Sequence, residues 1–425
     1  MQCEAVGEFM SESLLKEVRD KFYYVNWSPH DGQRIFLDNA SGSLRLKEMV
    51  QRVERELSLP DQLGRATSGS KHAGQVKSRG EYDVRLFLGV DGGVVMPAQS
   101  ATAAAFRVVE EAVANFRGSN VVTTALEHPC IYDSTQIFAR MYGKEWRVAP
   151  FDVRTGRVPV QSVVDIVDKE TSVLAIIHGS NVTGAYNDIG AIVTQARKKN
   201  PDLCIIVDGV QYAPHAPVDL TEIRPDAYII GCYKSFAKKG IAFAWLSDRF
   251  AAIPHRKLIG KKPHEWELGS MDQADFAAWS SVVDYWCWLG SHFTKSSDRR
   301  SQLVAGMKAA ERHETALLER LMYGTPQRRG LRSLTGVTAY CVDDGLSERA
   351  CLVSFNLANM PAPAAVDAYV SRGIAISARV SDAYSRHILE RIRVDSVVRL
   401  SACHYTSPEE IDAFLDVTED LIKTR

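Results

Sequence analysis

The chain has 425 residues, more than one simple core usually organises, so we expect two domains. Its 51 lysines and arginines nearly balance its 52 aspartates and glutamates, and the net charge of −1 argues against nucleic-acid or membrane-surface partners. The eight cysteines are scattered, which argues against a metal site or a disulfide framework. The chain has no apolar run of the ~18 residues that a membrane helix needs, and its N-terminus is unlike a signal peptide. These features favour a cytoplasmic enzyme.

The first part of the chain predicts short elements and one long loop. Residues 35–42 (IFLDNASG) predict a strand and a turn, with Asn39 and Ala40 at the turn. Residues 47–56 have helical periodicity. Residues 64–79 are rich in glycine, serine and basic side chains and lack periodicity, so we expect a loop there. That loop is either at the mouth of a site or a plain connection.

A candidate anion site follows. Residues 94–102 (VVMPAQSAT) predict a strand and a polar turn that lead into a helix over residues 103–116. Such an arrangement binds anions, because the free N–H groups and the dipole of the helix point at one spot. Ser100 and Thr102 are the candidate hydroxyl contacts, although a simple N-cap explains them equally well.

Two further buried strands end at polar residues. Residues 121–124 precede His128, and residues 173–178 precede Asn181. Strands alternate with helices here, and open parallel α/β sheets bind their ligands at the carboxyl ends of the strands. This placement favours functional roles, although a single histidine is more often structural.

The central stretch carries the most specific pattern. The apolar run 203–207 ends at Asp208, and the run 227–230 is followed by Tyr233 and Lys234. An aspartate that closes one buried strand and a lysine just past the next can hold pyridoxal 5'-phosphate. The lysine amine forms the Schiff base, and the carboxylate pairs with the pyridinium nitrogen.

The motifs DGVQ at 208–211, HAPVD at 215–219 and YKSF at 233–236 together resemble the core signature of the class V aminotransferase superfamily. That superfamily includes cysteine desulfurases, selenocysteine lyases, kynureninases and isopenicillin N epimerase. The resemblance runs from about residue 36 to residue 414. It implies an α/β fold of the fold-type I class, in which helices flank a mostly parallel, seven-stranded sheet.

The resemblance also implies a domain organisation. Residues 1–30 would form an N-terminal helix and extension that joins the small domain. Residues 31–295 would form the large cofactor-binding domain, and residues 296–425 a smaller α+β domain.

The resemblance further implies roles for individual residues. Lys234 would be the Schiff-base lysine and general acid/base, tuned by His128 and Tyr233. The residues expected to contact pyridoxal 5'-phosphate are Ser100, Ala101, Thr102, His128, Asn181, Asp208, Gln211, Tyr233, Lys234 and Ser270.

Substrate and partner contacts are implied as well. Arg399, in VRLSACHYTSPEEID, would grip the substrate α-carboxylate by a bidentate pair, near the backbone of Asn39 and Ala40. Ser270 would cross a homodimer interface to the neighbouring subunit's phosphate. His215 is either a support for the site or a packed core histidine.

One departure bears on the reaction. Cysteine desulfurases attack the substrate sulfur with a mobile cysteine, but no cysteine occurs between Cys351 and Cys403. Asp382 falls near the missing thiol, and Ser377 replaces the family's arginine. Without a thiolate, persulfide formation lacks its nucleophile. The pair Tyr233–Lys234 also departs from desulfurases, which have histidine before the lysine.

We therefore expect an enzyme that binds an L-amino acid-like substrate as a Schiff base and stabilises a carbanion. A lyase, or an enzyme that forms or breaks bonds at the β or γ carbon in specialised metabolism, is the first expectation. Aminotransfer or epimerisation is the alternative among enzymes. A desulfurase-like or non-catalytic partner protein is the other alternative.

Overall fold

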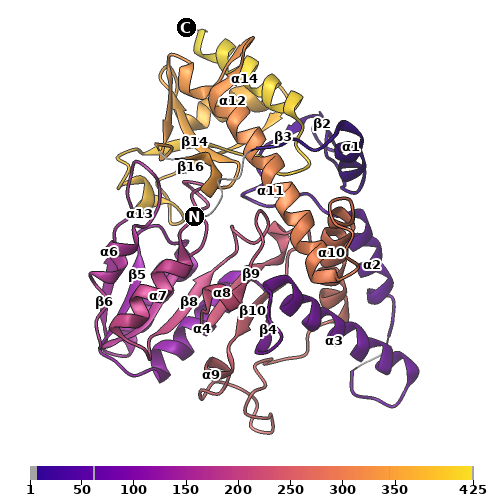
Figure 1. The fold of residues 1–425 in the computed structure, drawn as a ribbon, viewed down its shortest axis with the longest axis vertical. Coiled ribbons are helices and arrows are strands. Elements are labelled where there is room, and N and C mark those ends of the chain that lie inside the picture. The colour runs from indigo at the N-terminus through magenta and orange to yellow at the C-terminus, as the bar shows by residue number, and fades with distance from the viewer. Residues whose placement is uncertain (1–6, 61–62, 344, 424–425) are drawn as a thin grey trace.

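The computed structural model describes residues 7–60, 63–343 and 345–423. Two sheets organise this chain (Figure 1): a seven-stranded sheet in the first two thirds and a four-stranded sheet towards the C-terminus. The long helix α11 (Arg299–Tyr323) runs from one part to the other. No helix of the described residues has the length and apolar character needed to cross a membrane.

The large sheet has the strand order β4-β10-β9-β8-β7-β5-β6. The neighbours from β9 to β6 pair in parallel, whereas β10 is antiparallel to both β9 and β4. Every strand except β10 therefore ends at the same edge. The expected α/β fold with a mostly parallel, seven-stranded sheet is confirmed. The strands span Val94–Ala98 (β4), Asn120–Thr124 (β5), Glu145–Ala149 (β6), Thr171–Ile177 (β7), Cys204–Asp208 (β8), Ala227–Gly231 (β9) and Ala242–Leu246 (β10).

Helices cover both faces of this sheet because successive strand residues point to opposite sides. In β8, Cys204 and Ile206 pack with α4 (Ala101–Asn115) and α5 (Pro129–Met141), whereas Ile205 and Val207 pack on the other face. That second face is covered by α7 (Ile189–Lys199) and the aromatic helix α10 (Gln273–Ser291). The other helices of this part are α1 (Glu12–Asp20), α2 (Lys47–Leu57), α3 (Ser68–Leu88), α6 (Val160–Val164), α8 (Leu220–Ile223) and α9 (Asp248–Ala251).

The C-terminal sheet is antiparallel, in the order β13-β14-β17-β16, and packs against α11, α12 and α14 in a core of its own. The short β3 (Ile35–Phe36) pairs in parallel with β15 (Ile374–Ala375), so the N-terminal segment reaches this part. The proposed domain boundaries stay a prediction. The elements are β13 (Val337–Tyr340), β14 (Leu352–Leu357), α12 (Ala362–Val370), β16 (Ser377–Val380), α13 (Arg386–Leu389), β17 (Ser396–Ser401) and α14 (Pro408–Lys423).

The expected loop over residues 64–79 is wrong for most of its length, because α3 begins at Ser68. Two interactions explain a helix in a segment without obvious periodicity. Thr67 caps its N-terminus by accepting a hydrogen bond from the Ser70 N–H. Gly80 packs directly on Phe276 of α10, where a side chain would not fit. Glycine often indicates a loop, but Gly80 here allows two helices to pack closely.

Candidate active site

The carboxyl edge of the large sheet holds a cavity of about 170 Å³. It lies where β4, β5, β7, β8 and β9 end and loops begin, which is the expected ligand site of an open parallel sheet. Nearly all the residues predicted to contact a cofactor line it. They are Ser100, Ala101, Thr102, His128, Asn181, Asp208, Gln211, Tyr233 and Lys234, and they are joined by Cys130, Ile177 and Val210.

The start of α4 forms one end of the cavity. Ser100 is the N-cap, and its Oγ accepts a hydrogen bond of 3.1 Å from the Ala103 N–H. The N–H groups of Ala101 and Thr102 precede the hydrogen-bond ladder of the helix. Two backbone donors, the Thr102 hydroxyl and the positive end of the helix dipole therefore meet at one place, which suits a phosphate.

Asp208 and Lys234 line the same cavity, and both are buried. Burial lowers the pKa of Lys234 to about 7; the positive charge of Arg399 contributes, and Asp208 opposes it. Burial raises the pKa of Asp208, against the hydrogen bond of 3.0 Å that it accepts from the Val210 N–H. At neutral pH a large fraction of the lysine amine is therefore unprotonated and able to attack a carbonyl.

Three further side chains surround the lysine. Gln211 Oε1 accepts a hydrogen bond of 2.9 Å from Lys234 Nζ. Burial lowers the pKa of His128 to about 3, with help from Lys234 and Arg379, so its ring is neutral at pH 7. Burial raises the pKa of Tyr233, so this phenol keeps its proton.

Arg399 lies beside the cavity and is fully buried on β17. Its Nη2 donates to Asp38 Oδ1 at 3.0 Å and to Ser41 Oγ at 2.6 Å, and its Nη1 donates to the backbone oxygen of Asn181 at 2.9 Å. Its Nε has no hydrogen-bond partner among the described residues. The Asn181 backbone thus links this guanidinium to a cavity-lining residue, whose own Oδ1 is buried without a partner in the described chain.

Asn39, Ala40 and Ser270 do not line the cavity in the described chain. The backbone N–H groups of Asn39 and Ala40 donate to Ser401, and the Asn39 side chain bonds to Ser401 and Tyr405. These two residues hold the turn that carries Asp38 and Ser41. Ser270 lies exposed in the loop before α10.

Sequence reasoning missed Arg379. Its charge lowers the pKa values of His128, Lys234 and Arg399, so it lies near all three. The alternation of side chains along a strand could have found it. Ser377 Oγ contacts Arg399 Nη2 at 3.3 Å, and Arg379, two residues later in β16, lies on the same face of the sheet as Ser377. Arg379 thus lies two residues after Ser377, the position at which the family has an arginine.

The cysteines of the described chain are all buried. Cys130 lines the cavity with its Sγ 3.7 Å from Asp208 Oδ2, and burial and the Asp208 charge raise its pKa well above the ordinary value. It is therefore a thiol at neutral pH, not a nucleophile. Asp382, near the expected thiol position, is partly exposed and caps a turn by accepting from the Tyr384 and Ser385 N–H groups.

Comparison with known proteins agrees with this geometry. The family model described as aminotransferase class-V matches residues 35–414. The chain belongs to the class-V aminotransferase family. Enzymes of this family use pyridoxal 5'-phosphate, act on amino acids and are typically dimeric, so this chain is a pyridoxal phosphate-dependent enzyme.

Curated relatives of this class-V enzyme include a cysteine desulfurase of Pectobacterium atrosepticum, 26% identical over 312 residues that cover 69% of each chain. A cysteine desulfurase of Yersinia pestis is 25% identical over 311 residues, again with 69% of each chain covered. Among solved structures, an apo cysteine desulfurase of Thermococcus onnurineus has a TM-score of 0.81 at 20% identity and covers 96% of this chain and 98% of its own. The desulfurase CsdA of Escherichia coli has a TM-score of 0.76 at 18% identity, with the same coverage.

The residues present fit the cofactor. The start of α4 offers an anion site, Asp208 offers a buried carboxyl group, and Lys234 offers a partly unprotonated amine, all in one cavity. The unpartnered Asn181 Oδ1 in the same cavity is what a polar ligand would satisfy.

Proposed function

We propose that this enzyme acts on an L-amino acid-like substrate as a lyase, or forms or breaks a bond at its β or γ carbon. The observation that carries this proposal is the shared cavity of Lys234 and Asp208, in which the neighbouring cysteine is held as a thiol. The retained lysine and carboxylate support catalysis at Cα, and the absence of a cysteine at the desulfurase position argues against sulfur attack.

The placement of these residues in one cavity supports the proposed cofactor-binding roles. Lys234 would hold pyridoxal 5'-phosphate covalently, the start of α4 would bind its phosphate, and Asp208 would keep a proton on its ring nitrogen. When bound, this cofactor supplies a carbon that condenses with amines and a ring that takes up an electron pair from the substrate.

The chain's own groups would then move protons and orient the substrate. Lys234, with a pKa of about 7, suits general acid/base work because its two protonation states are both populated near neutral pH. Neutral His128 would pack at the cavity wall, and Tyr233 would donate from its protonated hydroxyl.

Arg399 would bind the substrate α-carboxylate. Its Nε is without a partner among the described residues, and its Nη2 donates to the Ser41 hydroxyl, which a carboxylate oxygen can replace. Asp38 and the Asn181 carbonyl would keep the guanidinium in place during that exchange. A paired carboxylate would then fix the substrate in one orientation.

The test is an absorbance scan of purified enzyme and a Lys234→Ala variant with cofactor, before and after single amino acids are added. We expect a Schiff-base band only in the wild type, and a shift of that band with one class of amino acid. A lyase should return to the starting band, whereas an aminotransferase should leave the amine form of the cofactor. An unchanged band in Lys234→Ala would refute the assignment.

Cysteine desulfurase activity is the second candidate, because the curated relatives carry that name. The same preparation should be given L-cysteine with a reductant, and sulfide and alanine should be measured together. Equal amounts of both would establish desulfurase chemistry despite the missing cysteine. Sulfide with pyruvate and ammonia would instead establish elimination.

A further inference from the structure

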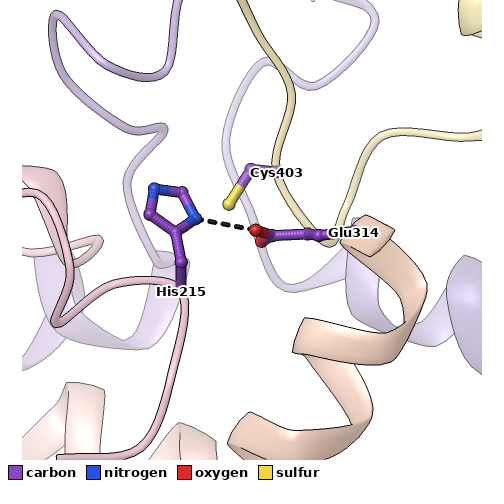
Figure 2. A group of neighbouring side chains, drawn as sticks. All are labelled: His215, Glu314 and Cys403. Atoms are coloured by element: carbon purple, nitrogen blue, oxygen red, sulfur yellow. Dashed lines mark hydrogen bonds and ion pairs between the residues drawn. The ribbon is translucent and has the colours of Figure 1, made fainter. Parts of the chain in front are cut away.

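A second buried polar cluster (Figure 2) is linked to Gln211 through His215. It consists of His215 in the loop after β8, Glu314 on α11 and Cys403 in the loop after β17. All three are at most 5% exposed. The figure shows the histidine ring and the carboxylate facing each other, with the cysteine sulfur beside the carboxylate. The cluster joins segments from the two sheets and from the helix between them.

A chain of hydrogen bonds leads from this cluster to the candidate Schiff-base lysine. Lys234 Nζ donates to Gln211 Oε1 at 2.9 Å. The other end of the same amide, Gln211 Nε2, lies 3.4 Å from His215 Nε2. On the far side of the ring, His215 Nδ1 lies 2.8 Å from Glu314 Oε2. Two side chains, Gln211 and His215, thus connect the lysine to a carboxylate on α11.

The donors and acceptors of this chain fit together in one way when Lys234 is an ammonium ion and the His215 ring is neutral. A lysine amine facing the amide donates, so the Gln211 oxygen faces Lys234 and the Gln211 NH₂ faces His215. An NH₂ group only donates, so His215 Nε2 must accept, and the ring proton must sit on Nδ1. That N–H then donates to Glu314, which needs a carboxylate oxygen there.

Glu314 is suited to that task. Although its burial alone raises the pKa, its interaction with His215, with a smaller contribution from His404, lowers it to about 2. The carboxylate is therefore ionised across the whole working pH range. Its second oxygen, Oε1, has no hydrogen-bond partner among the described residues, and His404 Nδ1 lies 3.8 Å from it.

The geometry favours a hydrogen-bonded pair over a metal site. Two ligand atoms bound tetrahedrally to zinc lie about 3.3 Å apart. The 2.8 Å between His215 Nδ1 and Glu314 Oε2 is a hydrogen-bond distance with no room for an ion between the two atoms. Burial also raises the pKa of Cys403 well above the ordinary value, so its sulfur keeps its proton.

We propose that Glu314 and His215 are positioning residues, which fix the amide of Gln211 with its oxygen towards Lys234. Glu314 accepts from His215 Nδ1 and so keeps the ring proton on that nitrogen. His215 Nε2 is then free to accept from the Gln211 NH₂, which has this partner only when the amide oxygen faces Lys234. If the amide turned over, its NH₂ would face the lysine and the ammonium form would lose an acceptor. The proposal rests on the proposed function, because it concerns the Schiff-base lysine.

Other charged and titratable groups act on Lys234 and must be held constant in any test. They are Asp208 on β8, Cys130 on α5, Arg379 on β16 and Arg399 on β17. None of them belongs to the chain from Gln211 to Glu314, so substitutions at Glu314 leave them in place. Glu314 itself faces His215, His404 and Cys403, and after burial its charge is the main cause that raises the pKa of Glu311 to about 7.

The experiment compares two substitutions that remove the same charge. Glu314→Met removes both the charge and the acceptor for His215, whereas Glu314→Gln keeps an acceptor oxygen. The pKa of Lys234 is read from the pH dependence of the rate at which the apoenzyme captures pyridoxal 5'-phosphate, because only the free amine attacks. We expect Glu314→Met to lower this pKa by about 1 unit and Glu314→Gln to lower it clearly less.

Controls separate the possible failures. Glu311→Gln removes a carboxyl group one turn away on α11 and should leave the capture profile unchanged. If Glu314→Met does not fold, His215→Phe removes the acceptor of the Gln211 NH₂ and should give the same shift. Equal shifts in Glu314→Met and Glu314→Gln would mean that only charge matters, and would overturn the proposal. No shift in either, or stoichiometric zinc that Glu314→Met removes, would overturn it too.

The Lys234→Ala variant distinguishes this failure from a failure of the proposed function. Loss of capture in Lys234→Ala together with an unchanged profile in Glu314→Met would refute only the positioning role. Capture that survives in Lys234→Ala would refute the Schiff-base assignment itself.

Discussion

At the scale of single residues, the site buries Lys234 at a cost in free energy. Lys234 is only 7% exposed, and its nearest hydrogen-bond partner is a neutral amide. The positive charges of Arg399 and Arg379 oppose its protonation, and the Asp208 carboxylate supports it. A lysine so placed is reactive because its charged form is costly, and the same cost lowers the stability of the apoprotein.

This cost predicts a pH-dependent gain in stability for Lys234→Met. The folded-state pKa of about 7 lies below the unfolded value of 10.5, so between these values the unfolded chain binds a proton that the folded chain lacks. The lysine therefore destabilises most at pH 7 and below, and the destabilisation fades as the pH rises towards 10.5. We expect the free-energy advantage of Lys234→Met over wild-type apoprotein to shrink by about 3 kcal/mol between pH 7 and pH 9.5.

Urea unfolding of both apoproteins at the two pH values measures the difference. Titrating groups that do not interact with Lys234 are common to both proteins, so their contributions cancel. An advantage that stays constant with pH would show that the lysine titrates in the folded state as it does in the unfolded chain.

The sequence located most cavity residues but not those that support them. Asp208, Lys234, His128 and Asn181 each follow a buried apolar run, and parallel strands bring such positions to one edge. Glu314 has no such signal. It sits in the middle of a long helix, 99 positions from His215, and only the packing of α11 brings the two together.

At the scale of elements, helix α3 shows how packing overrides local composition. Its glycines and serines are poor helix formers, yet Val84, Phe87 and Leu88 are fully buried against the large core. Buried Asp83 also pairs with Arg79 and with Arg299 of α11. Single-sequence periodicity did not find this helix because its inward face includes Gly80 and Asp83 instead of a continuous apolar stripe.

Two glycines of α3 predict opposite effects of the same substitution. A Cβ at Gly80 would lie 2.5 Å from the Phe276 Cβ, so Gly80→Ala should destabilise the protein by about 1–3 kcal/mol as α10 is pushed away. A Cβ at Gly74 meets nothing within 4 Å, so Gly74→Ala should stabilise it by up to about 1 kcal/mol through helix propensity.

Thermal unfolding followed by circular dichroism compares the two variants with the wild type. Gly74→Ala is the matched control, because it makes the same chemical change in the same helix six residues away. A Tm for Gly80→Ala equal to or above that of Gly74→Ala would show that α3 does not pack on α10 as closely as the structure has it.

At the scale of the whole molecule, the long helix α11 connects the cavity to the C-terminal sheet. Its N-terminal half packs with α10, and its C-terminal half packs with α14 (Figure 1). Glu314 sits between these halves, beside loops of both parts. The hydrogen bonds from Glu314 through His215 and Gln211 therefore link this helix to Lys234.

The loop between α9 and α10 bears on the oligomer. Leu258 and Leu268 expose 59% and 51% of their surface in this loop, Ile259 is fully exposed, and Ser270 is exposed in the same loop. Exposed apolar side chains gathered on one loop are typical of an interaction surface. Because members of this family are typically dimeric, we propose that this loop packs on a second copy and brings Ser270 to that copy's phosphate site.

The charge of the cofactor makes this proposal testable. Ser270→Glu would place a carboxylate against the cofactor phosphate and should raise the Kd of pyridoxal 5'-phosphate by roughly tenfold or more. Ser297→Glu adds the same charge at another exposed loop serine and should leave the Kd unchanged. A normal Kd in Ser270→Glu would place this residue away from the phosphate.

A mixed dimer decides which subunit the serine serves. One chain carries Ser270→Glu, the other carries Lys234→Ala, and two different affinity tags isolate the mixed species. If Ser270 acts on the partner, the chain with Ser270→Glu keeps its own lysine and receives an unaltered serine from the other chain. That single site should form the Schiff-base band with normal affinity, at about one cofactor per dimer. If Ser270 acts on its own chain, no site in the mixed dimer has both residues, and the band should stay as weak as in the Ser270→Glu homodimer.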